Sequence, residues 1–485
     1  MISSEVESLA RTGGLGDVVA ALSATLAELG EDVVVITPLY GVTTVPSETK
    51  RWYDTVAVRH GWGEGDVRHV GVVELETLRF PSGGTRRICL IDDPALFARA
   101  GIYGDANGAF GDNELRFAVM SRGALEIAAR LWEGGPDVIH GHDWHASFAV
   151  LYARLVMGEA WKRKATVFTV HNLAFQGVLD EGALDRLHLP REAFRPEILW
   201  HHGSVNLMKG ATALTDRITT VSPTYAQEIL TPELGFGLDE HLRAHEEKLS
   251  GILNGIDDRF DPRTDTAIAQ PFGLASAPAA RAVNKAALMR EVGLDPSDGP
   301  LFGCVSRLTW QKGIDLLVPL FGEIVERGGR VLVVGQGDGD LESSLVVAAE
   351  RFRGRVAACI AFDPLLSRRV YGGSDFFVVP SRFEPCGLTQ LYAMRYGAIP
   401  IVTNVGGLHD TVEPLDPANQ RGTGFVAAHP DVPSLRAAII AAFALWRDPG
   451  LVLEASARGM TENFSWTVPA EHYRTLFAKA AANPR

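Results

Sequence analysis

PSRFEPCGLTQLYAM, residues 380–394, lies between a short apolar run and a helical repeat of apolar side chains, and it decides the fold class. Residues 376–379 are apolar throughout, which is typical of a strand buried on both faces of a parallel sheet. Residues 388–395 carry apolar side chains at helical spacing. Pro380 cannot donate a hydrogen bond to a sheet, so it ends the strand. The stretch therefore predicts a strand, a sharp loop and a helix.

The loop in this stretch carries groups that could hold a ligand. Glu384 lies at the carboxyl end of the predicted strand, where open α/β sheets bind their ligands. Gly387 allows a ligand to approach the backbone closely, and the amides that open the next helix favour an anion. An ordinary strand-to-helix turn with a capping carboxylate is the alternative for this loop taken alone.

Length and composition indicate a globular protein of two or three domains. The chain has 485 residues, of which 46% are hydrophobic and 22% are charged. No apolar run reaches the roughly 18 residues that a membrane-spanning helix needs, and the N-terminus lacks the features of a signal peptide. The 4 cysteines are far apart in the sequence, which suits a reducing compartment. We therefore expect a cytoplasmic protein with no membrane partner.

The net charge narrows the class of ligand. The chain carries 46 basic and 59 acidic residues, and the formal charge of −13 argues against a nucleic acid or an anionic membrane as partner. A neutral polymer such as a glucan tolerates this charge. An anionic nucleotide would require a local cluster of arginine and lysine.

Short apolar runs alternate with longer amphipathic segments along the whole chain, which predicts α/β domains with parallel sheets and helices on both faces. The predicted strands are residues 33–37, 138–140, 165–170 and 218–221 in the first half, and 301–306, 331–334, 356–361, 376–379 and 399–402 in the second. The predicted helices include residues 15–29, 113–131, 316–327 and 388–395.

Two domains fit this pattern better than one. Residues 261–300 are rich in proline, alanine, glycine and aspartate and show no strand pattern, so we place the linker there. The predicted domains are residues 1–260 and 261–460, and the helical tail, residues 461–485, is expected to pack back on the first domain. Only residues 1–3 precede the first polar pair, so we expect most of the opening strand of the first domain to be missing.

Polar motifs open a helix or follow a strand at three places in the first half. In RTGGLGD, residues 11–17, a glycine-rich turn with Arg11 could hold a phosphate, although the glycine spacing is not that of the dinucleotide fingerprint. In HGHDWH, residues 140–145, we favour a sugar-binding loop over a metal site, with Asp143 accepting hydroxyl protons and Trp144 offering an apolar face. His171 follows a predicted strand, and both a structural and a functional role are open for it.

Arg307 and Lys312 lie on one loop directly after the predicted strand 301–306. Two cations on such a loop are what a diphosphate requires, because arginine can bind it bidentately and lysine acts as a point charge. A solvated pair on a surface loop is the alternative. The same arrangement occurs a second time in this half of the chain. Gly406 and Gly407 follow the predicted strand 399–402 and precede a helix, and their backbone amides are not covered by side chains of their own.

With these residues in hand, the chain resembles the bacterial glycogen synthases and plant starch synthases, the ADP-glucose-dependent glucosyltransferases of family five. Residues 3–6, SSEV, and 11–15, RTGGL, are similar to the family's SSEV…KTGGL opening. Further matching motifs run nearly from end to end: HGHDW at 140–144, HNLAFQG at 171–177, VSPTY at 221–225, NGID at 254–257, SRLTWQKG at 306–313 and the stretch at 380–394.

The resemblance implies a GT-B architecture, in which two Rossmann-like doubly wound domains face a deep cleft that holds ADP-glucose. It implies transfer of glucose to the 4-hydroxyl at the end of an α-1,4-glucan, with retention of configuration and with neither a metal nor another cofactor. The residues that it assigns to catalysis are Glu384, Arg307, Lys312, Asp143 and His171. Those that it assigns to binding the nucleotide sugar are Arg11, Gly13, Gly14, Asp17, Phe362, Cys386, Gly387, Leu388 and Thr389.

Three positions depart from the family pattern. Arg11 stands where the family has lysine, so the charge survives on a bulkier, planar donor. Phe362 stands where the family usually has the tyrosine that stacks on adenine, and we expect stacking to persist without the hydroxyl. Thr403 stands where members often have arginine. Two alternatives to the implied activity are a transferase that uses UDP-glucose and an inactive homologue that only binds glucan.

Overall fold

The computed structural model describes residues 1–46, 49–105 and 108–482 of the chain. The chain forms two compact units: unit 1 comprises Met1–Gly255 and Trp466–Arg485, and unit 2 comprises Ile256–Ser465. The chain passes between them at residues 255/256 and 465/466, whereas we expected boundaries at 260/261 and 460/461. None of the helices in the described residues combines the length and the apolar character that a bilayer-spanning segment needs.

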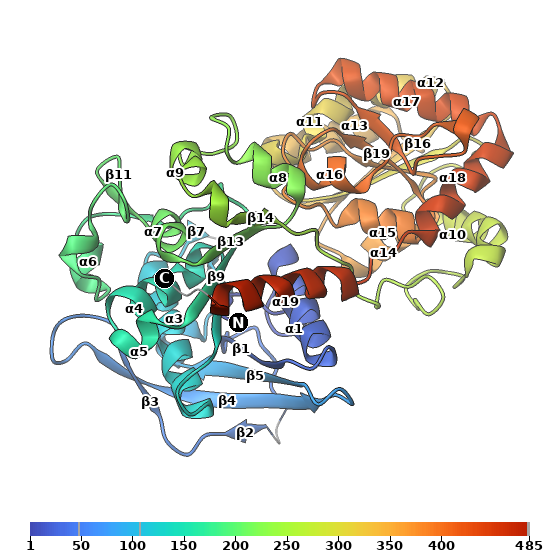
Figure 1. Cartoon of the computed structure of the whole chain (residues 1–485). Helices are drawn as coiled ribbons and strands as arrows, with labels where there is room; N and C mark the ends of the chain where they lie inside the picture. The colour runs from blue at the N-terminus through green and yellow to red at the C-terminus, as the bar shows by residue number, and fades with distance from the viewer. Residues whose placement is uncertain (47–48, 106–107, 483–485) are drawn as a thin grey trace. The chain divides into compact units, whose positions relative to one another are not determined.

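Unit 2 is built on a sheet of six parallel strands (Figure 1). In spatial order they are β17 (Val356–Ile360), β16 (Arg330–Gly335), β15 (Leu301–Val305), β18 (Phe376–Val379), β19 (Ile399–Thr403) and β20 (Phe425–Ala427). Renumbered along the unit, this order is 3-2-1-4-5-6, that of a doubly wound dinucleotide-binding domain. The prediction of an α/β fold with parallel sheets is confirmed here.

Helices cover both faces of this sheet because its strands are apolar on both sides. The helices of unit 2 are α10 (Ala277–Glu291), α11 (Ile314–Leu317), α12 (Phe321–Glu326), α13 (Gly339–Arg351), α14 (Pro364–Gly373), α15 (Thr389–Arg395), α16 (Gly406–Thr411), α17 (Val432–Trp446) and α18 (Pro449–Thr461). Along β15, Leu301 packs in the core under α10, α14 and α15. Phe302 and Cys304 pack in the core under α12, α13 and α17.

Two expectations for unit 2 differ from the structure. Residues 316–327 do not form one helix, because Pro319 lies in a short 3₁₀ turn between α11 and α12 and lacks the N–H of a continuous helix. The predicted linker, residues 261–300, contains α10, whose alanine-rich sequence favours a helix. Since α10 packs against α14, this segment is part of the folded unit.

Unit 1 contains a larger mixed sheet. One half consists of β1 (Asp32–Pro38), β5 (Thr85–Asp92), β4 (Val67–Arg79) and β2 (Lys50–Arg51), with β3 (Val56–Arg59) paired to β4. The other half consists of β14 (Leu249–Gly251), β13 (Arg217–Thr220), β9 (Ala165–Val170) and β8 (Val138–His142), all parallel. The hairpin of β4 and β5 is antiparallel and was not predicted.

Ile2 joins the two halves of this sheet. It forms parallel bridges to Gly141 of β8 on one side and to Ile36 of β1 on the other. Its N–H donates to the carbonyl of His140 at 2.9 Å, and the N–H of Ser3 donates to the carbonyl of Ile36 at 3.2 Å. The opening strand, which we expected to be mostly missing, is thus replaced by a bridge of minimal length that still places residues 3–5 at the carboxyl edge of the sheet.

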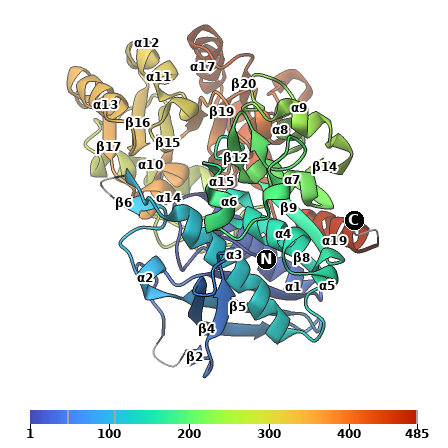
Figure 2. The ribbon, with the colours of Figure 1, turned by 90° about the vertical axis from the view of Figure 1, so that its left-hand side faces the viewer.

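Helices also cover both faces of the sheet in unit 1. Its longer helices are α1 (Gly14–Glu28), α3 (Asn113–Leu131), α4 (Asp143–Leu155), α7 (Leu207–Leu214) and α19 (Thr467–Ala482). Its short elements include α2 (Pro94–Phe97), β6 (Gly104–Asp105), β7 (Gly108–Ala109), α5 (Glu159–Lys162), β10 (Val178–Leu179), α6 (Ala183–Arg186), β11 (Trp200–His201), β12 (Ser204–Asn206), α8 (Pro223–Glu228) and α9 (Asp239–Arg243). α1 and α19 pack together on one face, and α3 and α4 lie side by side on the other (Figure 2).

Candidate active site

The two central strands of unit 2 bring the loops of Lys312 and Glu384 together. β15 and β18 are hydrogen-bonded neighbours, yet β16 lies on the far side of β15 and β19 on the far side of β18. Such a reversal of strand order opens a crevice at the carboxyl ends of the two strands, where doubly wound domains bind their ligands. The loop after β15 carries Arg307 and Lys312, and the loop after β18 carries Glu384.

Glu384 and Lys312 form an ion pair, with 2.6 Å between Oε2 and Nζ. The hydroxyl of Ser381 donates a hydrogen bond of 2.8 Å to the same Glu384 oxygen. Glu384 is only 6% exposed, and a carboxylate so deeply buried requires partners of this kind. Arg307 is exposed and pairs with no acidic side chain in the described residues, so its guanidinium is available to an anion.

Backbone contacts brace the two loops against each other. The N–H of Arg382 donates to the carbonyl of Gln311 at 2.8 Å, and the side-chain amide of Gln311 donates to the carbonyl of Phe383 at 3.2 Å. Gly313 has a φ of +64°, and a side chain there would overlap the carbonyl of Pro380. The ion pair therefore lies on a frame that leaves its two members little freedom to move apart.

The turn from Gly387 to Thr389 presents backbone amides that are unengaged within the described part of the chain. Gly387 has a φ of +68°, in the left-handed region that glycine adopts without strain. The amides of Gly387, Leu388 and Thr389 donate to no other atom within the part of the chain that is described, and the start of α15 favours negative charge. Gly407 makes room for the turn, because a side chain at 407 would overlap Cys386, which is itself buried. These amides can hold an anion.

Phe362, the predicted adenine platform, lies in the loop after β17 at the same edge of the sheet. Its ring is 68% exposed, and the following Asp363 anchors the loop by accepting the N–H of Leu366 at 2.8 Å. Two strand spacings, roughly 10 Å, separate β17 from β15. The ring and the two cations are therefore spaced along one edge, as an adenine and a diphosphate are spaced along a nucleotide.

In unit 1, Glu5 organises the glycine-rich turn, a role that the sequence analysis missed. Its carboxylate accepts hydrogen bonds from the N–H groups of Thr12 and Gly13, at 2.7 and 3.1 Å, and from the hydroxyls of Thr12 and Tyr103, at 2.8 and 2.7 Å. Glu5 is buried and has no cation beside it among these partners. The amide of Gly13 is therefore engaged in this conformation and is not free for the phosphate that this turn was predicted to hold.

Arg11 is engaged as well. Its guanidinium lies 2.8 Å from the carboxylate of Asp17, in the first turn of α1. Two residues predicted to bind the nucleotide sugar therefore neutralise each other here, and an anion would have to compete with Asp17 for Arg11. Gly14, the first residue of α1, is exposed.

Asp143 and His171 meet at the carboxyl ends of β8 and β9. Oδ1 of Asp143 accepts the N–H of His171 at 2.7 Å and the N–H of Asn172 at 3.4 Å. Burial raises the pKa of Asp143 to about 7, against the opposing effect of these two amides. Burial also lowers the pKa of His171 to about 3, so its imidazole is neutral at physiological pH.

Asp143→Asn is expected to make the protein more stable than the native chain at pH 8 but not at pH 4. Between its ordinary pKa of 3.8 and its native value of about 7, Asp143 holds a proton in the folded state that the unfolded state has lost. Its contribution to stability therefore falls as the pH rises through this window, and asparagine, which tolerates the φ of +57° found at Asp143, abolishes the fall. Thermal unfolding of both proteins from pH 4 to pH 8 measures the difference, and parallel curves would contradict the raised pKa.

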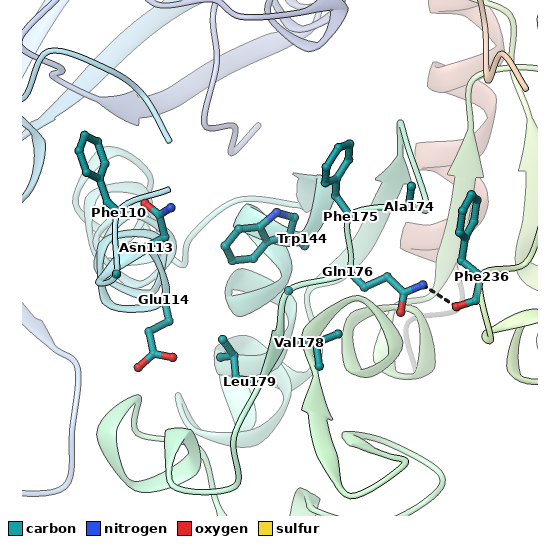
Figure 3. A pocket seen from close by; sticks show the side chains of 12 residues that line it. Phe110, Asn113, Glu114, Trp144, Ala174, Phe175, Gln176, Val178, Leu179 and Phe236 are labelled. Carbon is teal, nitrogen blue, oxygen red and sulfur yellow. Dashed lines mark hydrogen bonds between the residues drawn. The ribbon is translucent and has the colours of Figure 1, made fainter. Parts of the chain in front are cut away.

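A pocket of about 560 Å³ opens in unit 1 beside Trp144, the residue that follows Asp143 in the sequence (Figure 3). The side chains that line it are Phe110, Asn113, Glu114, Trp144, Ala174, Phe175, Gln176, Val178, Leu179 and Phe236. Aromatic and aliphatic side chains thus line the pocket together with amide and carboxylate groups, the combination that suits the apolar faces and hydroxyl rims of sugars. Gln176 is held by a hydrogen bond of 3.0 Å from its side-chain amide to the carbonyl of Phe236.

Metal ligation finds no support in the described residues. No group of three or more histidine, cysteine, aspartate or glutamate side chains there is arranged to hold a metal ion. The histidines of the 140–145 motif contact other protein groups instead: His140 lies 2.7 Å from the hydroxyl of Thr169, and His142 lies 3.0 Å from His171.

Comparison with known proteins identifies relatives of both units. Residues 1–244 match the family model of the starch synthase catalytic domain, and residues 299–444 match that of the glycosyl transferases group 1. The chain is 42% identical to a glycogen synthase of Myxococcus xanthus, over 98% of both chains. It is 40% identical to glycogen synthase 2 of Agrobacterium fabrum, over 99% of this chain and 92% of that one. The catalytic domain of starch synthase IV from Arabidopsis thaliana, solved with ADP and acarbose bound, is 32% identical, with a TM-score of 0.89 over 99% of this chain and 98% of that one.

Proposed function

Because the chain belongs to the glycogen and starch synthase family of glycosyltransferases, we propose that it transfers glucose from ADP-glucose to the non-reducing end of an α-1,4-glucan, with retention of configuration. The predicted family, the GT-B fold class and the assignment as a glycosyltransferase are confirmed by the comparisons. The roles of individual residues rest on the geometry of each unit.

One observation carries the proposal: Lys312 and Glu384 meet at the point where the strand order of unit 2 reverses. The diphosphate of the donor binds there, between the guanidinium of Arg307, the Lys312 ammonium and the amides of Gly387 to Thr389. The adenine stacks on Phe362 along the same edge. Lys312 neutralises the charge of Glu384. This arrangement suits a carboxylate that orients the sugar and the cation better than it suits a carboxylate that attacks as a nucleophile.

Catalysis follows from where charge develops. The bond between the anomeric carbon and the donor phosphate breaks while the acceptor hydroxyl adds from the same face, and the proton of that hydroxyl passes to the leaving phosphate oxygen. Negative charge grows on the departing ADP, next to fixed cations and amides that need no reorganisation. Such preorganised donors stabilise the transition state more than the ground state, which is what accelerates the step.

Unit 1 provides the glucan side. Its aromatic pocket is lined by Trp144, which follows Asp143 in the sequence, and we assign the carboxylate of Asp143 and the neighbouring His171 to contacts with sugar hydroxyls. The Arabidopsis relative was solved with both ADP and acarbose, which supports a nucleotide and a sugar chain as the two ligands of this fold.

The activity is tested with purified protein, ADP-[14C]glucose and glycogen. We expect label in the polymer, stoichiometric release of ADP, and much slower transfer from UDP-[14C]glucose. Equal rates with the two donors would show that the protein accepts a broader class of nucleotide sugars than ADP-glucose. Binding of glycogen with no release of ADP at any protein concentration would show an inactive glucan-binding protein.

Phe175→Ala is expected to raise the KM for glucan about tenfold, a change of the size that one aromatic contact contributes. Phe175 lines the pocket of unit 1, and its ring is 56% exposed, so truncation removes a ligand contact rather than core packing. The KM for ADP-glucose is expected to stay the same. Tyr53→Ala is the matched control, since Tyr53 is a fully exposed ring of the same unit outside this pocket. Equal effects of the two substitutions would exclude the pocket as a glucan site.

A further inference from the structure

Two neighbouring strands of unit 1 end in histidines that touch each other. His142 is the last residue of β8 and His171 directly follows β9, with 3.0 Å between Nδ1 of His142 and Nε2 of His171. His142 is fully buried, whereas His171 is half-buried. Burial lowers the pKa of both rings, so both are neutral near pH 7. A neutral imidazole carries one N–H, so one ring donates and the other accepts.

The far nitrogen of His142 decides which ring donates. Nε2 of His142 is buried and has no hydrogen-bond partner in the described residues. If His142 accepted at Nδ1, its proton would lie on Nε2 as a buried N–H without an acceptor, an arrangement that is rare in native proteins. If His142 donates from Nδ1, only a lone pair on Nε2 is left unpartnered, which is tolerated more often.

We propose that His142 is a positioning residue: its Nδ1–H donates to Nε2 of His171 and fixes the proton of His171 on Nδ1. The tautomer of a histidine is set in this way by the bond that its other nitrogen makes. Nδ1 of His171 contacts no hydrogen-bonding group in the part of the chain that is described, and it is not enclosed. His171 therefore presents an N–H outward.

The consequence concerns the chemistry of His171. A ring with its proton on Nδ1, and with Nε2 occupied by His142, can donate a hydrogen bond to a sugar hydroxyl oxygen but has no lone pair with which to take a proton. His171 then orients substrate as a donor and does not serve as a general base. This role rests on the proposed function, whereas the tautomer itself does not.

Nuclear magnetic resonance of the full chain, labelled with 15N at its 14 histidines, tests the tautomer without any substrate. Long-range 1H–15N correlations distinguish a ring protonated at Nδ1 from one protonated at Nε2, and the signals of His171 are identified by their loss in His171→Asn. We expect His171 to be protonated at Nδ1, the less common form of a free imidazole. Protonation at Nε2 would overturn the proposal.

Two substitutions of His142 connect the tautomer to turnover. In His142→Leu, the bond that fixes the tautomer is gone, so we expect the Nε2-protonated form of His171 to appear beside the Nδ1-protonated one and kcat to fall about tenfold, the worth of one ordinary hydrogen bond in a transition state. In His142→Asn, the side-chain amide takes the place of Nδ1–H, and we expect the native tautomer and most of kcat to return. Loss of kcat in His142→Leu with the Nδ1–H tautomer retained would overturn the proposal, as would failure of asparagine to restore it in a folded protein.

His140→Leu is the matched control. His140 lies on the same strand and is equally buried, but its Nε2 contacts the hydroxyl of Thr169 instead of His171. We expect this variant to lose stability while His171 keeps its proton on Nδ1. A changed tautomer in His140→Leu would show that general disturbance of the strand, and not the bond from His142, determines the state of His171. If the leucine variants do not fold, the native spectrum alone decides.

Discussion

Replacement of Glu384 by alanine is expected to lower turnover by about 10²- to 10³-fold while both units stay folded. Glu384 anchors Nζ of Lys312 at 2.6 Å and is itself held by Ser381. Without this anchor the flexible lysine stem samples several rotamers, and its charge no longer lies at a fixed place against the leaving diphosphate. A displacement of about 1 Å from the productive geometry is enough to cost roughly 10²-fold in rate.

The affinity for ADP is the second measurement on Glu384→Ala. Removal of the carboxylate leaves the Lys312 charge unneutralised, so the variant is expected to bind ADP at least as tightly as the native protein. Glu323→Gln is the matched control, because Glu323 pairs with Arg327 and Arg436 on the surface of the same unit. Near-normal turnover of folded Glu384→Ala would remove Glu384 from the site.

Replacement of Lys312 by alanine is expected to weaken the binding of ADP and ADP-glucose and to reduce turnover by about 10²- to 10³-fold. Lys312 supplies a point charge at the reversal of strand order, where the diphosphate is proposed to bind. This charge stabilises the negative charge that grows on ADP as it departs. The KM for glucan is expected to change little, because the glucan pocket belongs to unit 1. Lys312→Ala thus loses ADP affinity whereas Glu384→Ala retains it, a difference that a general loss of structure would not produce.

Two controls separate function from stability at Lys312. Lys285→Ala removes a lysine of the same unit that also lies 2.6 Å from a carboxylate, that of Asp375 before β18. It is expected to affect stability and not ADP affinity. The double variant Lys312→Ala/Glu384→Gln removes both charges of the pair, so Glu384 is not left as a buried charge without its partner, and it is expected to recover stability without recovering ADP affinity. Unchanged ADP affinity in Lys312→Ala would refute the diphosphate site.

The sequence predicted unit 2 well because its signals are local. A strand buried on both faces reads as a continuous apolar run, and the strand predicted at residues 376–379 is β18 as the structure has it. The loops with Glu384 and with Lys312 were both predicted to bind ligand, but not their contact. Their 2.6 Å ion pair forms because β15 and β18 are neighbours in the sheet. The order of strands in a sheet depends on contacts between distant segments, so no single segment of the sequence predicts it.

Unit 1 was predicted less completely, for reasons that are equally physical. The antiparallel hairpin of β4 and β5 was missed: β4 mixes polar and apolar residues and lacks the continuous apolar run of a strand buried on both faces, although β5 has such a run at residues 88–91. Glu5 lies in the SSEV motif, but its four hydrogen bonds join it to Thr12, Gly13 and Tyr103, which lie 7 to 98 residues away in the sequence. No local sequence pattern predicts these bonds. The same holds for His142 and His171, which are 29 residues apart and meet only because β8 and β9 pair.

Hydrogen exchange of the full chain, with and without saturating ADP, tests the central claim most directly. Amides that bond a phosphate exchange more slowly when the nucleotide is present. We predict slower exchange at residues 387–389, whose amides are unengaged within the described part of the chain, and in the loop of residues 307–313. Saturation with ADP that slows exchange in neither segment, and slows it elsewhere, would contradict the account.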